Sequence, residues 1–482
     1  MTFGQGASSV CLPVIDQKKP NVLFLFADDQ RADAMGCAGN SYIRTPNIDK
    51  LSETGVRFTN AYVMGGHHGA ICAPSRAMLM SGKSLFHVYD KLEGVETMPA
   101  YFGKHGYETF GTGKWHNEKS AFEASFQKGK NVFLGGMSNH FSIPCCDLGA
   151  DGKLSKPEKK GFSTDVFAGS AIDFLKEYGA GKRDKPFFCY VAFTVPHDPY
   201  SPKDEYVDRY PAGSLPLPGN FLPLHPFEFD NLTVRDENLL AWPRDPLMVK
   251  AALADYYGLI AHLDDRIGDI ISELKKNGLF ESTIIVYAAD NGLAIGSHGL
   301  LGKQDLYEHS MKVPLIVSGP GIPAGKTKTA LVYLLDLFPT LAELCGLPSP
   351  QGTDGKCLAP VIKGKTGEVR TSLFTAYRNT VRAVRTAEWK LIRYPERNYT
   401  QLYNLINDPL ELNNLAGIKA WQQKTDEMTA LLKEWQTQVN DTVSLTAKKI
   451  LPLEYDSSKL IRKPDANQPE YTLKKYFKER DK

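Results

Sequence analysis

The sequence is poor in cysteine, in long apolar runs and in charge imbalance, and each shortage excludes a class of protein. Eight cysteines in 482 residues are too sparse for a disulfide scaffold, and their spacing matches no zinc site. Because 57 Lys and Arg stand against 55 Asp and Glu, for a net charge of +2, the chain has no overall basic field for nucleic acid. It also has no run of eighteen apolar residues, so we expect neither nucleic acid nor a membrane span.

The first twenty residues lack the marks of a secretory signal. They contain neither a charged n-region nor an apolar h-region. Either a signal has been removed or the protein stays inside the cell. No internal repeat or low-complexity segment is visible, and a 42% hydrophobic content in a chain of this length is enough for one large domain and a smaller one.

The chain alternates between apolar strand patterns and amphipathic helix patterns. Strands are predicted at 21–29 and 282–292, and a long helix at 250–278. A shorter helix is predicted at 46–55, with Gly55 as its C-cap. This alternation predicts an α/β fold with a large mixed, mostly parallel sheet sandwiched by helices.

Polar side chains follow three of the predicted buried strands. Ligands bind beyond the carboxyl ends of strands in such sheets, so these positions are candidates for a functional site. The three pairs are Asp28 with Asp29, His197 with Asp198, and Asp290 with Asn291.

Two adjacent carboxylates at the end of a buried strand, Asp28 and Asp29, are costly unless a positive charge separates them. Each acidic motif alone fits a turn or a helix cap, since Asp-Asn-Gly at Asp290 is common turn chemistry. Taken together, oxygen ligands at two strand ends favour a hard cation, Ca²⁺ or Mg²⁺, over zinc.

Three further stretches carry basic side chains. GTGKWHNEK places Lys114 and His116 on one side of an extended segment, although a solvated loop fits as well. His197, in TVPHDPY, follows a buried strand and fits a structural or a catalytic role equally. A glycine-rich loop that carries His298 and Lys303 could hold an oxyanion, but its spacing is not that of a phosphate-binding loop.

A proline-rich, irregular tract at 200–246 interrupts the alternation. A structureless loop of this length in a compact domain is more often functional than not, and we interpret it as a lid or rim. After residue 365 the sequence changes to short strands and turns, then a helix and a charged tail. This change predicts a smaller C-terminal α+β subdomain.

One short motif is specific enough to indicate a family. CAPSRAMLMSG, residues 72–82, resembles the sulfatase signature, in which Cys or Ser is followed two residues later by Pro-Ser-Arg. The supporting motifs ADD, GKWH, PHDP, ADNG and HGLLGKQDLYE follow in the family's order. From about residue 20 to about 415 the chain resembles a type I sulfatase of the alkaline-phosphatase-like superfamily.

The resemblance implies a sulfatase catalytic domain at 20–365 and a smaller C-terminal subdomain at 366–482. In that family the signature cysteine is oxidised to formylglycine (3-oxoalanine), so Cys72 would be the precursor of an aldehyde, and the partner that converts it a formylglycine-generating or anaerobic sulfatase-maturing enzyme. A hydrated aldehyde has two hydroxyls: one attacks sulfur, and deprotonation of the other expels sulfate and restores the aldehyde.

The resemblance also assigns roles to individual residues. Asp28, Asp29, Asp290 and Asn291, with the modified Cys72, would hold one divalent cation, Ca²⁺ with Mg²⁺ as the alternative. Arg76 would hold the formylglycine, and Lys114 and Lys303 would clamp the sulfate oxygens. His116 would deprotonate the hydrate during release, and His197 would protonate the leaving alcohol. His298 would lie beside the sulfate as a substrate-binding residue.

Seven other residues are candidates for contacts with an anionic sugar, although ordinary packing or surface positions explain each of them as well. They are His67, His68, Arg235, Trp242, Arg244, Arg378 and Arg382.

The expected function is hydrolysis of an O-sulfate ester on a carbohydrate. General likeness favours an exo-acting enzyme on glycosaminoglycan oligosaccharides, with a 2-O-sulfated uronate as one substrate hypothesis. The alternatives are an arylsulfatase, a phosphate or phosphonate ester hydrolase of the same superfamily, and a catalytically silent carbohydrate-binding protein. The expected location is the periplasm or outside the cell.

Overall fold

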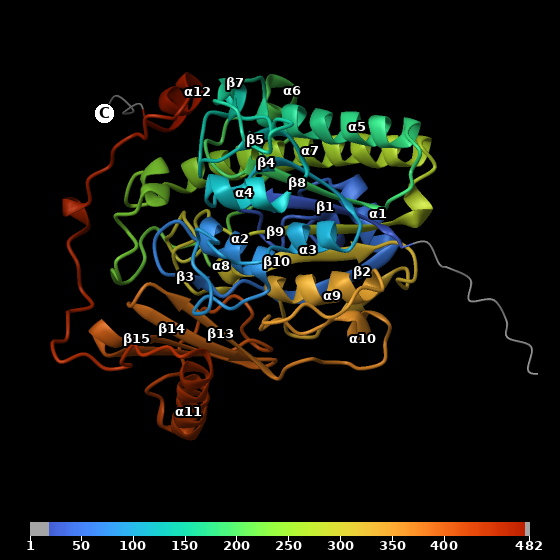
Figure 1. Ribbon diagram of the computed structural model, residues 1–482. Helices are drawn as coiled ribbons and strands as arrows, with labels where there is room; N and C mark the ends of the chain where they lie inside the picture. Colours follow the sequence, from blue (N-terminus) through green and yellow to red (C-terminus); the bar gives the residue numbers. More distant parts are fainter. Residues whose placement is uncertain (1–18, 478–482) are drawn as a thin grey trace, which may run out of the picture.

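The computed structural model describes residues 19–477, and its centre is one large twisted sheet (Figure 1). The strand order is β11-β2-β10-β9-β1-β8-β4-β5, with β12 beside β2. Strand β10 runs antiparallel to both neighbours, and the other pairings are parallel. The predicted α/β fold with a mostly parallel sheet is therefore confirmed.

The strands of this sheet are β1 (Asn21–Asp28), β2 (Gly55–Tyr62), β4 (Glu108–Lys114), β5 (Lys128–Phe133), β8 (Phe187–Pro196), β9 (Thr283–Ala289), β10 (Lys312–Ser318), β11 (Lys326–Lys328) and β12 (Val332–Tyr333). A separate hairpin pairs β6 (Pro144–Cys145) with β7 (Glu158–Lys159).

Helices cover both faces of the sheet, as the apolar strand sequences require. Along β1 the side chains alternate between two cores: Phe24 and Phe26 face one, and Leu23 and Leu25 face the other. Helices α1, α5, α6 and α7 pack on the second face, and α2, α3, α4 and α9 on the first (Figure 1).

The helices are α1 (Pro46–Glu53), α2 (Cys72–Ser81), α3 (Met98–Lys104), α4 (Lys119–Ser125), α5 (Ser163–Ala180), α6 (Asp204–Val207), α7 (Pro246–Lys276), α8 (Glu308–Met311), α9 (Leu337–Leu344), α10 (Ala359–Ile362), α11 (Gln422–Val439) and α12 (Glu470–Thr472).

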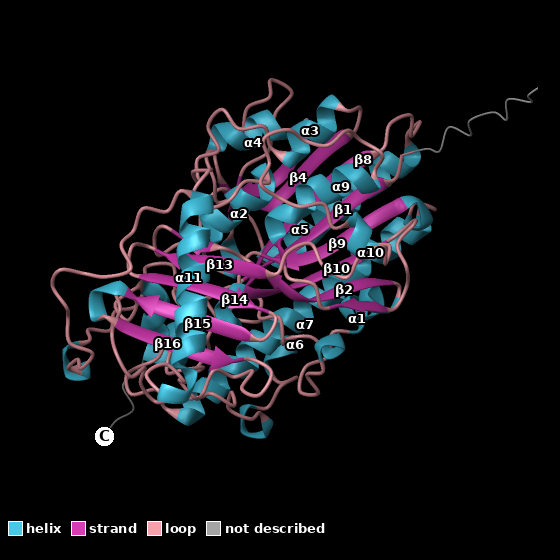
Figure 2. Ribbon diagram, turned by 90° about the horizontal axis from the view of Figure 1, so that it is seen from below, coloured by secondary structure: helices cyan, strands magenta, loops and turns pink. Residues whose placement is uncertain are grey.

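A second, smaller sheet lies below the first, with α11 packed against it (Figure 2). Its order is β16 (Tyr399–Asn404), β15 (Trp389–Tyr394), β14 (Val381–Thr386), β13 (Ser372–Tyr377) and β3 (Gly65–Gly66). Strand β3 comes from the N-terminal part, just before the signature motif, and pairs parallel with β13. The domain boundary predicted at residue 365 stays a prediction. The pairing of β3 with β13 joins segments on the two sides of it.

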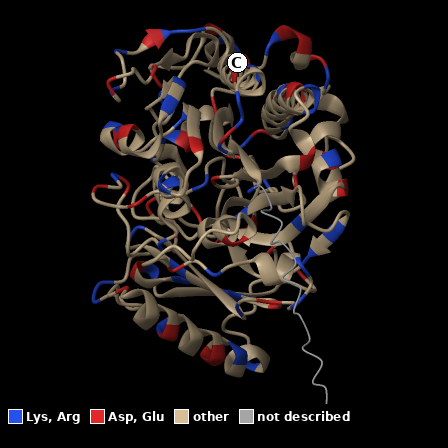
Figure 3. Cartoon of the chain, turned by 45° about the vertical axis from the view of Figure 1, so that its right-hand side comes forward, with Lys and Arg blue, Asp and Glu red and all other residues tan. Residues whose placement is uncertain are grey.

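Two long segments without regular sheet structure wrap the sheet. Before α7 begins at Pro246, the tract that starts at Tyr200 contains α6, short 3₁₀ turns and one isolated bridge, from Phe221 to Ser297. The C-terminal strap, residues 442–477, leaves α11 and returns to the large sheet's helices (Figure 1). Charges of both signs are interspersed over the fold (Figure 3), in keeping with the near-zero net charge.

One helix end differs from the expectation. Helix α1 ends at Glu53 with Thr54 as its C-cap, and Gly55 is instead the first residue of β2. A Cβ on Gly55 would lie 2.4 Å from the carbonyl oxygen of Val317 in β10. Glycine is therefore required here by the close approach of two strands rather than by a helix cap.

Gly113 in β4 gives a test of the sheet beside the site. Its φ is +89°, and a Cβ would lie 1.8 Å from the carbonyl oxygen of Ala192 in β8. We expect Gly113→Ala to lower the free energy of unfolding by more than about 2 kcal/mol, measured by urea unfolding. The control is Gly169→Ala in α5, where no atom lies within 4 Å of the added carbon. That variant should change stability by less than about 1 kcal/mol, and equal losses for both variants would contradict the steric argument.

Candidate active site

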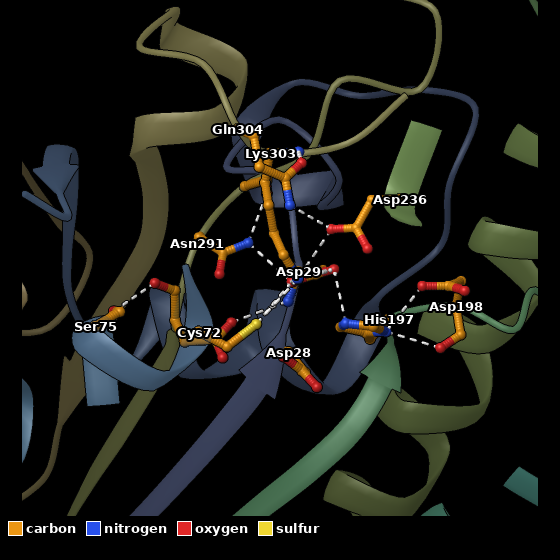
Figure 4. A network of polar contacts seen from close by, with 12 residues as sticks. Asp28, Asp29, Cys72, Ser75, His197, Asp198, Asp236, Asn291, Lys303 and Gln304 are labelled. Atoms are coloured by element: carbon orange, nitrogen blue, oxygen red, sulfur yellow. Dashed lines mark hydrogen bonds and ion pairs between the residues drawn. The ribbon is translucent and has the colours of Figure 1, made fainter. Parts of the chain in front are cut away.

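The polar pairs predicted at strand ends meet at one place. Asp28 ends β1 and Asp29 follows it, while His197 follows β8 and Asp290 follows β9, the two neighbours of β1. The first residue of α2, Cys72, faces this cluster (Figure 4). All five side chains are buried.

Cys72 lies between a cation and a carboxylate. Its Sγ accepts a hydrogen bond from Lys303 Nζ at 3.0 Å and donates one to Asp29 Oδ1 at 3.4 Å. Lys303 Nζ also contacts both Asp29 oxygens, at 2.6 and 2.8 Å. Burial and the negative charge of Asp290 raise the pKa of the Cys72 thiol well above its usual value, so the thiol stays protonated.

Arg76 lies one helical turn after Cys72 on the same face of α2. Its guanidinium contacts Asp290 Oδ2 through Nε and Nη2, both at 2.9 Å, and donates to the Lys114 carbonyl oxygen at 2.7 Å. Lys114 in turn pairs with Asp28 at 2.5 Å. The signature helix is thus tied to the ends of three strands by charge-assisted hydrogen bonds.

The acidic cluster could hold a metal ion. One ligand atom each from Asp28, Asp29, Cys72 and His197 lie within 4.8 Å of one another. Within residues 19–477, Asp28 Oδ1 and Asn291 Oδ1 are buried and have no hydrogen-bond partner. Burial and the nearby Asp290 charge raise the pKa of Asp28 to about 6. Buried oxygen atoms that receive no hydrogen bond can act as ligands of a metal ion, so this cluster could hold one.

The two histidines near Cys72 have opposite electrostatic surroundings. Burial disfavours charge on both, but the carboxylate of Asp29, 3.6 Å from His197 Nε2, raises the pKa of His197. Burial and the cation of Lys114 lower the pKa of His116 well below its usual value. His116 also leaves the extended geometry predicted for its segment, with a φ of +58°.

A cavity of about 390 Å³ opens beside Cys72. Its lining comes from the strand ends, from the tract and from the small sheet's side of the molecule. The lining residues are Gly69, Ala70, Cys72, His116, Gly136, Met137, His197, Val234, Arg235, Asp236, Lys303, Gln304 and Arg378.

The cavity wall includes residues that the sequence analysis did not single out. Asp236 lies 3.8 Å from Lys303 Nζ and accepts a hydrogen bond from Gln304 at 2.7 Å. Asp198, which the sequence analysis had paired with His197, is not in the cavity lining; it forms ion pairs with His197 and with Arg235. Gln304 directly follows the motif residue Lys303, so this adjacency was the available sequence signal for it. Asp236, in the tract, had no such signal.

Four of the candidate sugar contacts lie outside the cavity lining, and two of them, Arg244 and Arg382, form buried ion pairs. Arg244 is buried against Glu237, and Arg382 is buried against Asp441. The exposed His68 pairs with Asp90, and Trp242 packs beneath Arg244.

His67 and His298 are not in the cavity lining either. His67 packs edge-on against Phe86. His298 stacks on Tyr307 at a ring distance of 4.0 Å, so its predicted contact with the sulfate gains no support. Of these candidates, Arg235 and Arg378 do line the cavity.

Comparison with known proteins agrees with this geometry. The family model described as Sulfatase matches residues 20–347, more than half of the chain. The chain belongs to the sulfatase family. It is a sulfuric ester hydrolase. A second model, described as N-sulphoglucosamine sulphohydrolase, C-terminal, matches residues 296–438.

Individual relatives are similar over most of the chain. An N-acetylglucosamine-6-O-sulfatase of Bacteroides thetaiotaomicron is 27% identical and covers 88% of both chains. An arylsulfatase of Clostridium perfringens is 27% identical over 86% of this chain and 94% of its own.

Solved structures share the fold. One, in complex with its substrate D-glucosamine-2-N,6-O-disulfate, has a TM-score of 0.74 at 24% identity, covering 88% of this chain and 99% of its own. A phosphonate monoester hydrolase of Agrobacterium radiobacter has a TM-score of 0.71 at 21% identity, covering 87% and 96%. Within residues 19–477, no helix has the length and apolar character that a membrane span needs.

Cation binding should stabilise the sulfatase. Because an ion that binds only the folded state raises the melting temperature, we expect Ca²⁺ or Mg²⁺ to shift thermal unfolding upward and chelation to reverse the shift. Asn291→Ala removes one unpartnered oxygen and should reduce the shift. The control Asn131→Ala removes a similarly buried, unpartnered oxygen in β5 and should leave the ion-induced shift intact. A shift of equal size in both variants would contradict the assignment of Asn291.

Proposed function

We propose that this sulfatase removes an O-sulfate from a sulfated carbohydrate, with Cys72 as the precursor of the nucleophile. The observation that carries the proposal is the position of Cys72, buried between Lys303 and Asp29 at the start of α2. A nucleophile placed there faces a cation on one side and a cluster of cation ligands on the other.

The state of the thiol supports maturation of Cys72. With its pKa well above the usual value, the thiol is a poor nucleophile, since the thiolate is the reactive form. A formylglycine at this carbon, made by a formylglycine-generating or anaerobic maturing enzyme, supplies a hydroxyl nucleophile and a second hydroxyl for release of sulfate. Arg76 and Lys303 hold the side chain in place.

The charged side chains bind and orient the sulfate group. Lys303 is a buried cation in the cavity lining, and Lys114 is a buried cation paired with Asp28. In a buried site the attraction of both cations for sulfate oxygens is strong. Asp28, Asp29, Asp290 and Asn291 would hold a Ca²⁺ ion, with Mg²⁺ as the alternative, and this ion would supply Lewis-acid stabilisation of the developing negative charge.

Two histidines divide the proton transfers. His197 has a raised pKa, which suits a donor of a proton to the leaving alcohol. His116 has a lowered pKa and is therefore neutral near pH 7, which suits the base that deprotonates the second hydroxyl. Both line the same cavity as Cys72.

The cavity supports an exo-acting enzyme on a charged sugar. About 390 Å³ is at the small end of the range for ligand pockets and suits one terminal sugar unit. Arg378 at its rim is about one-third exposed and can face a second anionic group. We propose a glycosaminoglycan oligosaccharide, with a 2-O-sulfated uronate and a 6-O-sulfated glucosamine, the latter suggested by the Bacteroides relative, as the two substrates to compare. The proposed location is the periplasm or outside the cell.

The test is sulfate release, with Ca²⁺ supplied, from sulfated disaccharides, an aryl sulfate and an aryl phosphate. Wild type should cleave one sugar sulfate. Cys72→Ala should lower kcat by at least about a thousandfold, because the covalent route is lost. The control is Cys37→Ala, which replaces a half-buried thiol on another face and should retain activity.

Other outcomes would contradict the proposal. Faster cleavage of the phosphate ester would favour the phosphate or phosphonate hydrolase alternative. Activity confined to the aryl sulfate would make the enzyme an arylsulfatase. No cleavage by a preparation in which mass spectrometry finds the aldehyde at Cys72 would reject this substrate class and favour a silent binding protein.

A further inference from the structure

His197, the catalytic acid proposed above, contacts Asp198, and Asp198 in turn contacts residues of two segments that are distant in the sequence. We propose that Asp198 is the positioning residue of His197, and that Arg235 of the tract and Gln468 of the C-terminal strap hold Asp198 in place. This inference rests on the proposed function, in which His197 protonates the leaving alcohol.

The imidazole of His197 is held on both of its nitrogens (Figure 4). On one side, Nδ1 lies 2.7 Å from the backbone oxygen of Asp198 and 3.1 Å from its carboxylate Oδ1. On the other side, Nε2 lies 3.6 Å from Asp29 Oδ2. Nδ1 therefore donates to Asp198, and Nε2 is the nitrogen that faces the reacting groups.

Asp198 is fixed by a two-pronged ion pair. Arg235 Nη1 and Nη2 donate to the two carboxylate oxygens at 2.8 and 2.9 Å. A bidentate pair of this kind fixes the plane of the carboxylate as well as its distance. Arg235 also pairs with Asp236 and lines the cavity. The tract therefore forms part of the cavity wall next to His197.

The strap adds a second support from the other end of the chain. Gln468 Nε2 donates to Asp198 Oδ2 at 3.1 Å. The strap is anchored on both sides of Gln468: Arg462 donates to the backbone oxygens of Asn238 and Leu239 in the tract, at 2.9 and 2.6 Å, and Lys475 pairs with the buried Asp255 of α7 at 2.8 Å.

These contacts define what Asp198 does in the reaction. As the bond between sulfur and the leaving oxygen breaks, the proton on His197 Nε2 passes to that oxygen, which leaves as the alcohol. Asp198 holds the ring so that Nε2 faces that oxygen. Without Asp198, one of the two contacts that fix the ring orientation is lost from Nδ1.

The experiment compares leaving groups. A nitrophenolate departs without a proton, whereas a sugar alkoxide needs one, so a misplaced acid slows only the sugar ester. We expect Asp198→Ala to lower the ratio of kcat on the cleaved sugar sulfate to kcat on 4-nitrophenyl sulfate by at least about tenfold, with KM for the sugar changed far less. Gln468→Ala should lower the ratio in the same direction but less. The control Asn467→Ala replaces an exposed neighbour on the strap and should leave the ratio unchanged.

Other outcomes of the same experiment would overturn the role of Asp198 or the proposed function on which it rests. Equal losses on both esters in Asp198→Ala would show a general structural role and overturn it, as would a His197→Ala enzyme without leaving-group dependence. If Asp198→Ala fails to fold, Asp198→Asn, which keeps the volume and loses the charge, is judged by the same ratio. A matured wild type that releases sulfate from neither ester rejects the proposed function itself, and with it the acid that Asp198 would position.

Discussion

The structure depends on burying three carboxylates at neighbouring strand ends. Asp28, Asp29 and Asp290 are almost fully buried, where like charges at this distance cannot persist unless cations neutralise them. Lys114 pairs with Asp28, Lys303 with Asp29 and Arg76 with Asp290. One cation for each carboxylate makes the burial tolerable, and in the described part of the chain Asp28 Oδ1 and Asn291 Oδ1 still lack a hydrogen-bond partner.

This charge balance explains the architecture around it. The cations come from three different places: the end of β4, a loop after β9 and the first turns of α2. Each must reach the same point, so the sheet order, the entry of α2 and the loop that carries Lys303 are fixed together. The same pairing places Cys72 between Lys303 and Asp29, so the arrangement that stabilises the buried acids also holds the reactive carbon.

Much of this could be predicted from sequence because it is local. Apolar runs that end in acids predicted the strands and their polar ends, and the signature motif predicted the residues around Cys72. Contacts between distant segments leave no local pattern in the sequence. Arg244 and Arg235 both lie in the irregular tract, and the sequence around them does not show that Arg244 is buried whereas Arg235 lines a cavity. For the same reason, the stacking of His298 on Tyr307 and the contact of Gln468 with Asp198 could not be predicted from the sequence.

The pairing of β3 with β13 has a consequence for the order of folding. Gly65 and Gly66 precede the signature helix by a few residues, yet their partners Ala376 and Tyr377 are synthesised some three hundred residues later. Contacts this far apart in sequence form late, because the loop they close must be ordered first. A nascent chain that ends near residue 365 therefore carries an unpaired strand edge beside Cys72, and the segment around the reactive carbon acquires its final neighbours only when nearly the whole polypeptide has emerged.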